Sequence, residues 1–258
     1  MPLAYYSVAA AREFWTEHWG GHTVGELLAV ARTSPLTALI TAALPRDGMV
    51  LEAGCGLGQY VVLLRERGWR AAGVDWSVDA LRACRRVAPV PLAAMELRAL
   101  ALRDAAVATY VSLGVVEHDV AGPDAILAEA ARVLRPGGVA LVSVPYLNGM
   151  RRLGAPWLRY RNRTIARAGG AFYQYAFSRT ELVAALARQG LLTRATHPYD
   201  PARLLRRVWR RTPGRGSGGA TGAPSSRGRL AAAARRALYT APVLRLLGHM
   251  LLAVAVKR

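Results

Sequence analysis

The chain has 258 residues, 53% of them hydrophobic, and a formal net charge of +19. This length and apolar content exclude an intrinsically disordered chain and fit one sizeable α/β domain. Two cysteines, Cys55 and Cys84, are too few for a disulfide framework and lack metal-ligand spacing. We therefore predict a reducing compartment and no metal site.

The positive charge is almost entirely arginine, with Lys257 as the sole lysine. Such a charge attracts phosphates, nucleic acid or anionic lipid, but an arginine-rich proteome also produces solvated surfaces of this kind, and both interpretations stay open. The first residues lack the basic leader and continuous apolar run of a signal peptide. The longest late apolar stretch, residues 246–256, is too short to span a bilayer. We expect a soluble, cytoplasmic protein.

Residues 1–47 are predicted to form a helical cap. One helix covers residues 8–19, and a second, residues 24–32, is capped by Thr23 with Glu26 three residues further on. A third helix begins at Pro35, since proline suits the first turn of a helix. Several side chains of this region either line a lid over a ligand or pack between helix and sheet: Tyr5, Tyr6, Trp15, His18 and Trp19.

The stretch VLEAGCGLGQY, residues 50–60, combines a short apolar strand, three glycines and the start of a helix. Glycines are needed where a backbone turns tightly or approaches a ligand, and the free amides at a helix start attract anions. The spacing is G-x-G-x-G rather than the G-x-G-x-x-G of dinucleotide sites. A second apolar run, residues 71–74, ends at Asp75, about 20 residues after the turn, where a ribose diol is usually bound.

Strands and helices alternate through the rest of the chain, which predicts a parallel sheet. Further helices are expected at residues 78–87 (capped by Ser77), 123–134 and 179–188 (capped by Ser178). Further strands are expected at residues 89–92, 110–113, 139–144 and 191–197. Residues 146–177 look irregular, with alternating arginines and aromatics. The last part is predicted as a basic helix at 201–211, a Gly/Ser/Pro-rich linker at 212–228, a helix near 230–247 and an antiparallel strand at 249–256.

Five segments in this order resemble class I S-adenosylmethionine (SAM)-dependent methyltransferases of the small-molecule, type 11-like group: VLEAGCGLGQY, GVDWS, MELRALALRDAAVATYVSLGVVEH, VLRPGGVALVSVP and FSRTELVAALARQGL. The resemblance implies a Rossmann-like α/β fold with a seven-stranded, mostly parallel sheet, helices on both faces and an antiparallel last strand. It also implies an N-terminal helical cap and a lid insertion after strand 5. The chain is then one domain, divided into a cap (1–47), a SAM-binding core (48–146), a substrate lid (147–177), a late helix and strand 6 (178–211), a linker loop (212–228), and the last helix and strand 7 (229–258).

The resemblance also implies roles for individual residues. Glu96 takes the place of an acid that accepts a hydrogen bond from the adenine amino group, while Ala101 and Ala108 depart from the usual proline and aspartate. The SAM-binding residues are Glu52, Gly54, Cys55, Gly56, Gly58, Asp75, Trp76, Glu96, Leu97 and Leu113. His118, just past a strand tip, is the candidate catalytic base or a locally packed histidine. The candidate substrate contacts are Glu117, Tyr146, Arg151, Arg152, Trp157, Tyr173 and Tyr175.

Three functions follow from these features. The first is methyl transfer from SAM to a small-molecule acceptor by in-line displacement. The second follows from the basic segments 203–211 and 227–236 and the apolar stretch 238–252: action on nucleic acid or, with a lipid- or quinone-like acceptor, weak peripheral contact with an anionic membrane. Nucleic acid is not expected, because no RNA-binding module or N-P-P-Y motif is present. The third is a non-catalytic SAM-binding or interaction domain.

Overall fold

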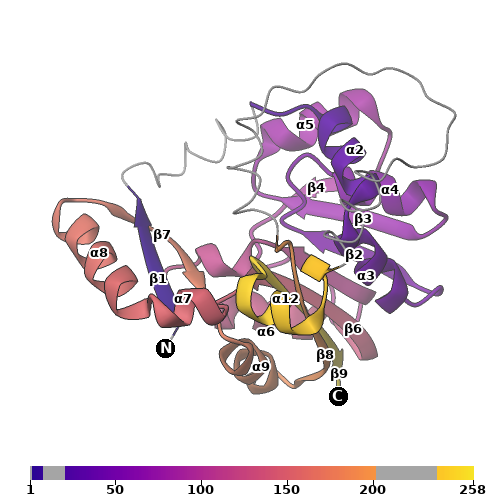
Figure 1. The fold of residues 1–258 in the computed structure, drawn as a ribbon. Coiled ribbons are helices and arrows are strands. Elements are labelled where there is room, and N and C mark those ends of the chain that lie inside the picture. Colours follow the sequence, from indigo (N-terminus) through magenta and orange to yellow (C-terminus); the bar gives the residue numbers. More distant parts are fainter. Residues whose placement is uncertain (1, 8–20, 202–236) are drawn as a thin grey trace, which may run out of the picture.

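Seven strands form one sheet in the order β4-β3-β2-β5-β6-β9-β8 (Figure 1). A computed structural model of the protein describes residues 2–7, 21–201 and 237–258. Only β9 runs antiparallel to its two neighbours, which confirms the mostly parallel sheet with an antiparallel last strand. The strands are β2 (Met49–Ala53), β3 (Arg70–Asp75), β4 (Leu92–Ala94), β5 (Val107–Leu113), β6 (Leu134–Pro145), β8 (Leu191–Tyr199) and β9 (Met250–Lys257).

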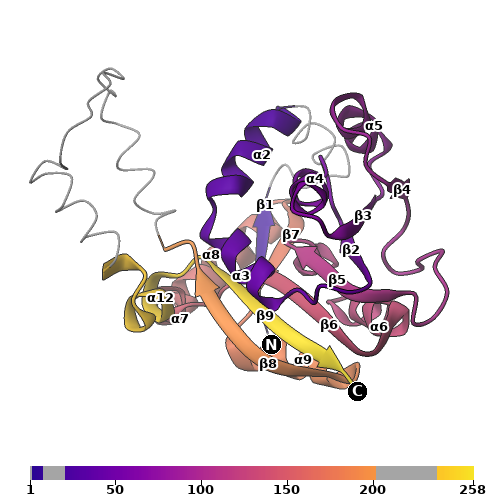
Figure 2. The same cartoon turned by 90° about the vertical axis from the view of Figure 1, so that its right-hand side faces the viewer.

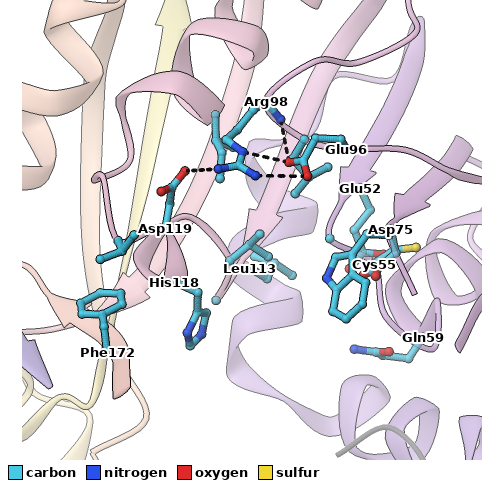
Figure 3. Close-up of a pocket in the computed structure, with 17 residues that line it drawn as sticks. Glu52, Cys55, Gln59, Asp75, Glu96, Arg98, Leu113, His118, Asp119 and Phe172 are labelled. Atoms are coloured by element: carbon cyan, nitrogen blue, oxygen red, sulfur yellow. Dashed lines mark hydrogen bonds and ion pairs between the residues drawn. The ribbon is translucent and has the colours of Figure 1, made fainter. Parts of the chain in front are cut away.

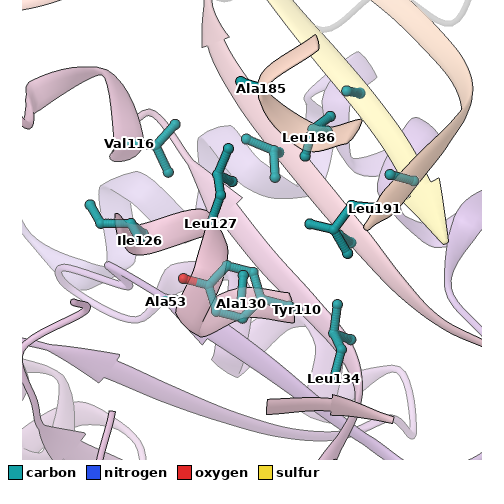
Figure 4. Close-up of a cluster of buried hydrophobic side chains, with 14 of the residues drawn as sticks. Ala53, Tyr110, Val116, Ile126, Leu127, Ala130, Leu134, Ala185, Leu186 and Leu191 are labelled. Carbon is teal, nitrogen blue, oxygen red and sulfur yellow. The ribbon is translucent and has the colours of Figure 1, made fainter. Parts of the chain in front are cut away.

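Helices cover both faces of this sheet. Successive residues of a strand point to opposite faces, so each strand contributes side chains to an apolar cluster on either face. Tyr110 of β5 belongs to the apolar cluster under α6 (Asp124–Val133) and α9 (Arg179–Arg188), as Figure 4 shows. The next residue, Val111, belongs to the cluster on the other face. That second cluster is covered by α2 (Val24–Thr33), α3 (Pro35–Ala43), α4 (Gln59–Glu66) and α5 (Val78–Val87).

The helix starts follow the predicted caps. Thr23 and Ser178 each form a capping box with the glutamate three residues later, and Ser77 accepts a hydrogen bond from the amide of Ala80. Each cap satisfies amides that the first turn of a helix leaves without a partner. The sequence therefore placed α2, α5 and α9 to within one residue.

A second, smaller layer was not predicted. Residues Leu3–Ser7 form a strand, β1, that pairs antiparallel with β7 (Ala171–Ala176), and two helices, α7 (Gly149–Leu153) and α8 (Ala155–Arg167), precede β7. Figure 1 shows α8 beside this ribbon, at one end of the main sheet. The prediction of an all-helical start and of an irregular segment at 146–177 was wrong. β1 and β7, about 170 residues apart in the chain, supply each other's backbone hydrogen bonds, and local sequence does not encode such a pairing.

Several boundaries differ from those predicted; the fourth strand, for example, begins at Val107 rather than Tyr110. The third strand is residues 92–94 rather than 89–92, and the fifth begins at Leu134, which pairs with Val107 of β5. The last helix was predicted near residues 230–247, whereas α12 spans Ala241–Leu247. Pro242 lies in its first turn, where the missing proline amide is tolerated. The predicted helices at 8–19 and 201–211, the linker and residues 230–236 lie outside the described residues. In the described part of the chain, no helix has the length and apolar character required to cross a membrane.

Candidate functional site

The carboxyl ends of four neighbouring parallel strands, β4, β3, β2 and β5, meet at one edge of the sheet. Ligands of open α/β sheets bind outside such ends. The glycine turn follows β2, Asp75 ends β3, Glu96 follows β4, and the 3-10 turn η1 (Val116–His118) follows β5. The topology therefore gathers the residues that the sequence singled out.

The turn between β2 and α4 requires glycine. Gly54, Gly56 and Gly58 have φ angles of 78°, 52° and 67°, in the region that favours glycine. A Cβ on Gly54 would lie 2.5 Å from Cγ2 of Val115, so a side chain there would also collide with the loop after β5. The turn is thus fixed both by its own backbone and by the neighbouring loop.

Asp75 is oriented by the turn it faces. Its Oδ2 accepts a 2.7 Å hydrogen bond from the amide of Gly56, and its Oδ1 accepts a 2.8 Å bond from the amide of Ser77. Burial raises the pKa of this carboxyl, and the amides of Ser77 and Gly56 act in the opposite direction by stabilising the carboxylate. The side chain is therefore held in one position at the tip of β3.

Glu52 is a second buried acid. Its Oε2 accepts a hydrogen bond of 3.1 Å from the amide of Val61 in the first turn of α4, so it satisfies an amide that the helix leaves unpaired. Burial raises the pKa of Glu52 to about 8, with a smaller contribution from the charge of Asp75. Such a carboxyl is poised to ionise when a cationic group approaches.

A cavity of about 930 Å³ lies at this edge of the sheet (Figure 3). Nine of the predicted site residues line it: Glu52, Gly54, Cys55, Asp75, Trp76, Glu96, Leu97, Leu113 and His118. Gly56 and Gly58 are not among the described residues that line it; they shape the turn behind it. Sequence reasoning missed the other lining residues: Gln59, Arg98, Gly114, Val115, Asp119, Val120, Ile126 and Phe172.

Several of the missed lining residues stand next to motif residues in the sequence, which is a signal that could have identified them. Gln59 directly follows the last glycine of the turn, Arg98 is two residues after Glu96, and Asp119 follows His118. Phe172 carries no local signal, since it reaches the cavity from β7 through pairing with β1. Only the tertiary structure reveals it.

Arg98 links two acids across one wall of the cavity. Its Nε lies 3.2 Å from Oε1 of Glu96, and its Nη1 lies 3.8 Å from Oδ2 of Asp119, as the dashed lines in Figure 3 mark. The Arg98 guanidinium lowers the pKa of Glu96. Glu96, expected as a simple acceptor for an adenine amino group, is thus already paired with an arginine of its own chain.

Comparison with known proteins agrees with this arrangement. Residues 51–142 match a family model described as a methyltransferase domain. A probable S-adenosylmethionine-dependent methyltransferase of Mycolicibacterium smegmatis (strain ATCC 700084 / mc(2)155) is 39% identical over 97 residues, which are 37% of this chain and 37% of that protein. The trans-aconitate 2-methyltransferase of Azoarcus sp. (strain BH72) is 33% identical over 172 residues, covering 61% of this chain and 65% of that protein.

The chain contains a class I SAM-dependent methyltransferase domain. In both relatives the match spans less than two thirds of the relative's length. The crystal structure of a SAM-dependent methyltransferase from Mesorhizobium loti shares the fold, with a TM-score of 0.58 and 18% identity over 88% of this chain and 99% of that one. SAM is the cofactor of this family.

The cavity of the methyltransferase domain suits such a cofactor. Its wall holds the carboxyls of Glu52 and Asp75, which suit a ligand with an amino group, a sulfonium and a ribose diol. Within the described structure, the buried Oε1 of Gln59 has no hydrogen-bond partner, although buried polar atoms normally have one. A ligand in this cavity could supply that donor. The same structure shows no group of three His, Cys, Asp or Glu side chains of the kind that holds a metal ion.

His118 lies further along the cavity from the glycine turn. Its Nδ1 is 2.7 Å from the backbone oxygen of Tyr173, and because a carbonyl only accepts, Nδ1 carries the proton. Burial lowers the pKa of His118, whereas the Tyr173 carbonyl acts against this by stabilising the charged ring. Its Nε2, the nitrogen able to accept a proton, lies 3.9 Å from Oε1 of Glu117. Burial raises the pKa of Glu117 to about 8.

The predicted substrate contacts occupy several different surroundings. Tyr173 packs edge-to-face on His118 at 5.3 Å, and the Tyr175 hydroxyl donates to the Val120 carbonyl at 2.9 Å. Arg151 donates to the backbone oxygens of Tyr146 and His249. Arg152 and Trp157 are exposed on α7 and α8. Of residues 147–177, Phe172 alone is among the described residues that line the cavity.

Of the cap side chains expected to line a lid or pack against the sheet, two lie in β1 and three lie outside the described residues. Tyr5 and Tyr6 lie in β1, and the Tyr6 ring meets Phe172 edge-to-face at 6.0 Å. Tyr6 therefore packs on a residue of the cavity wall. Trp15, His18 and Trp19 lie outside the described residues.

Proposed function

We propose that this protein transfers a methyl group from SAM to a small-molecule acceptor. The observation that carries the proposal is one continuous cavity, with the glycine turn and Asp75 at one end and His118 and Phe172 at the other. Its volume of about 930 Å³ is near the upper end of the range for ligand sites, so it can hold a cofactor and an acceptor together.

We infer that the cofactor end holds SAM through three groups of contacts. Asp75, fixed by two backbone amides, would accept hydrogen bonds from the ribose hydroxyls. Trp76, Leu97 and Leu113 supply apolar surface for the adenine ring, with the Glu96–Arg98 pair at its edge. Glu52 suits the amino group of the cofactor. When bound, SAM would supply an electrophilic methyl group: the acceptor would bond to the methyl carbon in line with the breaking S–C bond, and the demethylated thioether would leave.

The acceptor end is apolar apart from His118 and Asp119. Val120, Ile126 and Phe172 add apolar surface there, which would limit the water around a sulfonium. A neutral His118 can take a proton at Nε2 if the acceptor carries one. Of the predicted substrate contacts, we retain Tyr173 and Glu117, which contact His118. The others, Tyr146, Arg151, Arg152, Trp157 and Tyr175, are not among the described residues that line the cavity, and the proposal does not use them.

Support for a small acceptor comes from a relative that is named for methylating trans-aconitate. We extend this to the class of acceptor only: a small molecule that enters a cavity rather than a polymer that binds along a surface. A soluble, cytoplasmic location is part of the same proposal. The proposal includes no nucleic acid and no metal ion.

Calorimetric titration of the full chain with SAM, and separately with its demethylated product, tests the cofactor site. We expect micromolar binding of both, lost in Asp75→Ala and retained in Asp79→Ala, since Asp79 is an exposed acid on the adjoining helix α5. Binding that survives Asp75→Ala would place the ribose elsewhere. No binding to the wild-type protein would favour the interaction-domain alternative. A screen for acceptors then measures release of the demethylated product.

A further inference from the structure

The outer side of α7 and α8 carries a stripe of exposed apolar side chains. Met150, Leu153, Trp157 and Tyr160 follow one another at intervals of three or four residues, which places them on one side of a helix. Leu153 is 77% exposed and Trp157 is 60% exposed. The hydrogen bonds from the Gly154 amide to the Met150 oxygen and from the Leu158 amide to the Gly154 oxygen continue the helical pattern across the junction of α7 and α8.

This stripe is not needed to hold the fold together. The inner side of α8 packs on β1 through other residues: Leu158 joins the cluster of Leu3 and Leu147, and buried Asn162 accepts a hydrogen bond from the amide of Tyr6. The outer stripe therefore exposes large apolar groups with no structural need. Such stripes are usually interaction sites.

The charged residues within α7 and α8 themselves are all positive. Residues 149–167 contain six arginines and no acidic residue. Five of the arginines are exposed, and within the described part of the chain none of these five pairs with a carboxylate: Arg152, Arg159, Arg161, Arg163 and Arg167. Exposed arginines elsewhere, such as Arg188 with Asp124, do form ion pairs. The surface is thus complementary to a partner that is anionic throughout.

We propose that this α7–α8 face, defined by Met150, Leu153, Trp157, Tyr160 and the five arginines, docks onto an anionic membrane surface. Amphipathic helices of this composition lie in the plane of the interface, with aliphatic and aromatic groups among the acyl chains and arginines at the headgroups. Trp and Tyr favour that depth. Nucleic acid offers no apolar layer for Met150 and Leu153.

Neighbouring elements extend the face. Leu246 of α12 is exposed and lies against α7, where a Cβ on Gly149 would be 2.8 Å from its Cδ1; Figure 2 shows α12 beside α7. The face also belongs to the smaller layer that reaches the cavity. In this layer α8 packs on β1, and β1 pairs with β7. Phe172 of β7 then lines the cavity. Docking by this face does not depend on methyl transfer, so it can be tested separately.

Sedimentation of the full chain with lipid vesicles tests the proposal. We expect the wild-type protein to bind vesicles containing about 30% phosphatidylglycerol, to bind phosphatidylcholine vesicles weakly, and to lose most binding between about 0.1 M and 0.5 M salt. The double variant L153D/W157D should bind at least about tenfold more weakly. The control V30D/V87D makes the same kind of change at two exposed valines on α2 and α5 and should bind like wild type.

Thermal unfolding verifies that both double variants are folded. Vesicles with brominated acyl chains provide a second readout: they should quench tryptophan fluorescence in the wild-type protein and much less in Trp157→Phe. Equal vesicle binding by L153D/W157D and V30D/V87D would overturn the proposal, because another part of the chain would then bind the lipid. Failure of the wild-type protein to bind anionic vesicles would also overturn it and leave the face to an acidic protein or a nucleic acid.

Discussion

The imidazole of His118 is tied to the backbone of Tyr173, with 2.7 Å between Nδ1 and the carbonyl oxygen. The bond joins η1, at the end of the main sheet, to β7 of the smaller layer, 55 residues further along the chain. It fixes the tautomer with the proton on Nδ1 and leaves Nε2 as the proton acceptor. The smaller layer thus orients the candidate base.

This arrangement predicts that His118 titrates below its ordinary pKa of 6.5, because burial disfavours the charged ring. The depressed pKa means that the unfolded chain binds the proton more readily, so the contribution of His118 to the free energy of unfolding should fall as pH drops below 6.5, opposite to the trend that Glu117 contributes. Nuclear magnetic resonance of the labelled imidazole measures the midpoint directly. A midpoint at or above 6.5 would contradict the prediction.

Replacing His118 with Ala should slow turnover by about 10²–10⁴-fold with an acceptor whose proton must be removed. SAM affinity should stay nearly unchanged, because the predicted cofactor contacts lie at the other end of the cavity. Steady-state kinetics and calorimetry on the same preparation separate the two effects. Unchanged turnover with such an acceptor would remove His118 from the mechanism.

Gly54→Ala should destabilise the protein by about 3 kcal/mol or more, since a strained φ adds to a clash with Val115. Gly68 is the matched control: its φ of 87° is equally unfavourable for alanine, but no atom lies within 4 Å of the new Cβ. Gly68→Ala should cost only about 1 kcal/mol. Urea unfolding of both variants measures the difference, and equal losses would show that the contact with Val115 is unimportant.

Glu117→Gln should stabilise the protein at alkaline pH. Burial raises the pKa of Glu117 to about 8 in the folded state, against 4.5 as its ordinary value, so the folded chain holds a proton that the unfolded chain releases. Stability is therefore lost as pH rises from 4.5 through 8, on the order of 5 kcal/mol by pH 9. The variant should lose most of this slope in unfolding measured across the range. Glu66→Gln, which changes an exposed acid, should keep it.

Tyr110 and Tyr199 should respond in opposite ways to replacement by phenylalanine. The hydroxyl of Tyr110 is buried without a hydrogen-bond partner in the described structure, so Tyr110→Phe should stabilise by about 1 kcal/mol. The hydroxyl of Tyr199 lies 2.6 Å from Oγ of Ser143, so Tyr199→Phe should cost about 1 kcal/mol. Thermal unfolding measures both. A destabilised Tyr110→Phe variant would indicate a partner for its hydroxyl, such as buried water.

Sequence alone was sufficient for most elements of the main sheet and for which residues meet at the glycine-turn end of the cavity. Strand and helix alternation, the caps at Thr23, Ser77 and Ser178 and the glycine turn before Asp75 are local patterns, because each depends on residues close together in the chain. Parallel strands bring their carboxyl ends to one edge, so Glu52, Asp75, Glu96 and His118 could be expected there together. Their predicted roles in binding and catalysis still rest on the experiments above.

The smaller layer and what it does to the site were decided only by tertiary structure. The pairing of β1 with β7 joins residues about 170 positions apart, and such pairing depends on two backbones meeting in space. Phe172, the tautomer of His118 and the outward stripe of α7 and α8 all follow from that pairing. The sequence of residues 146–177 shows arginines and aromatics, but only packing against β1 determines which side chains face the cavity and which face outward.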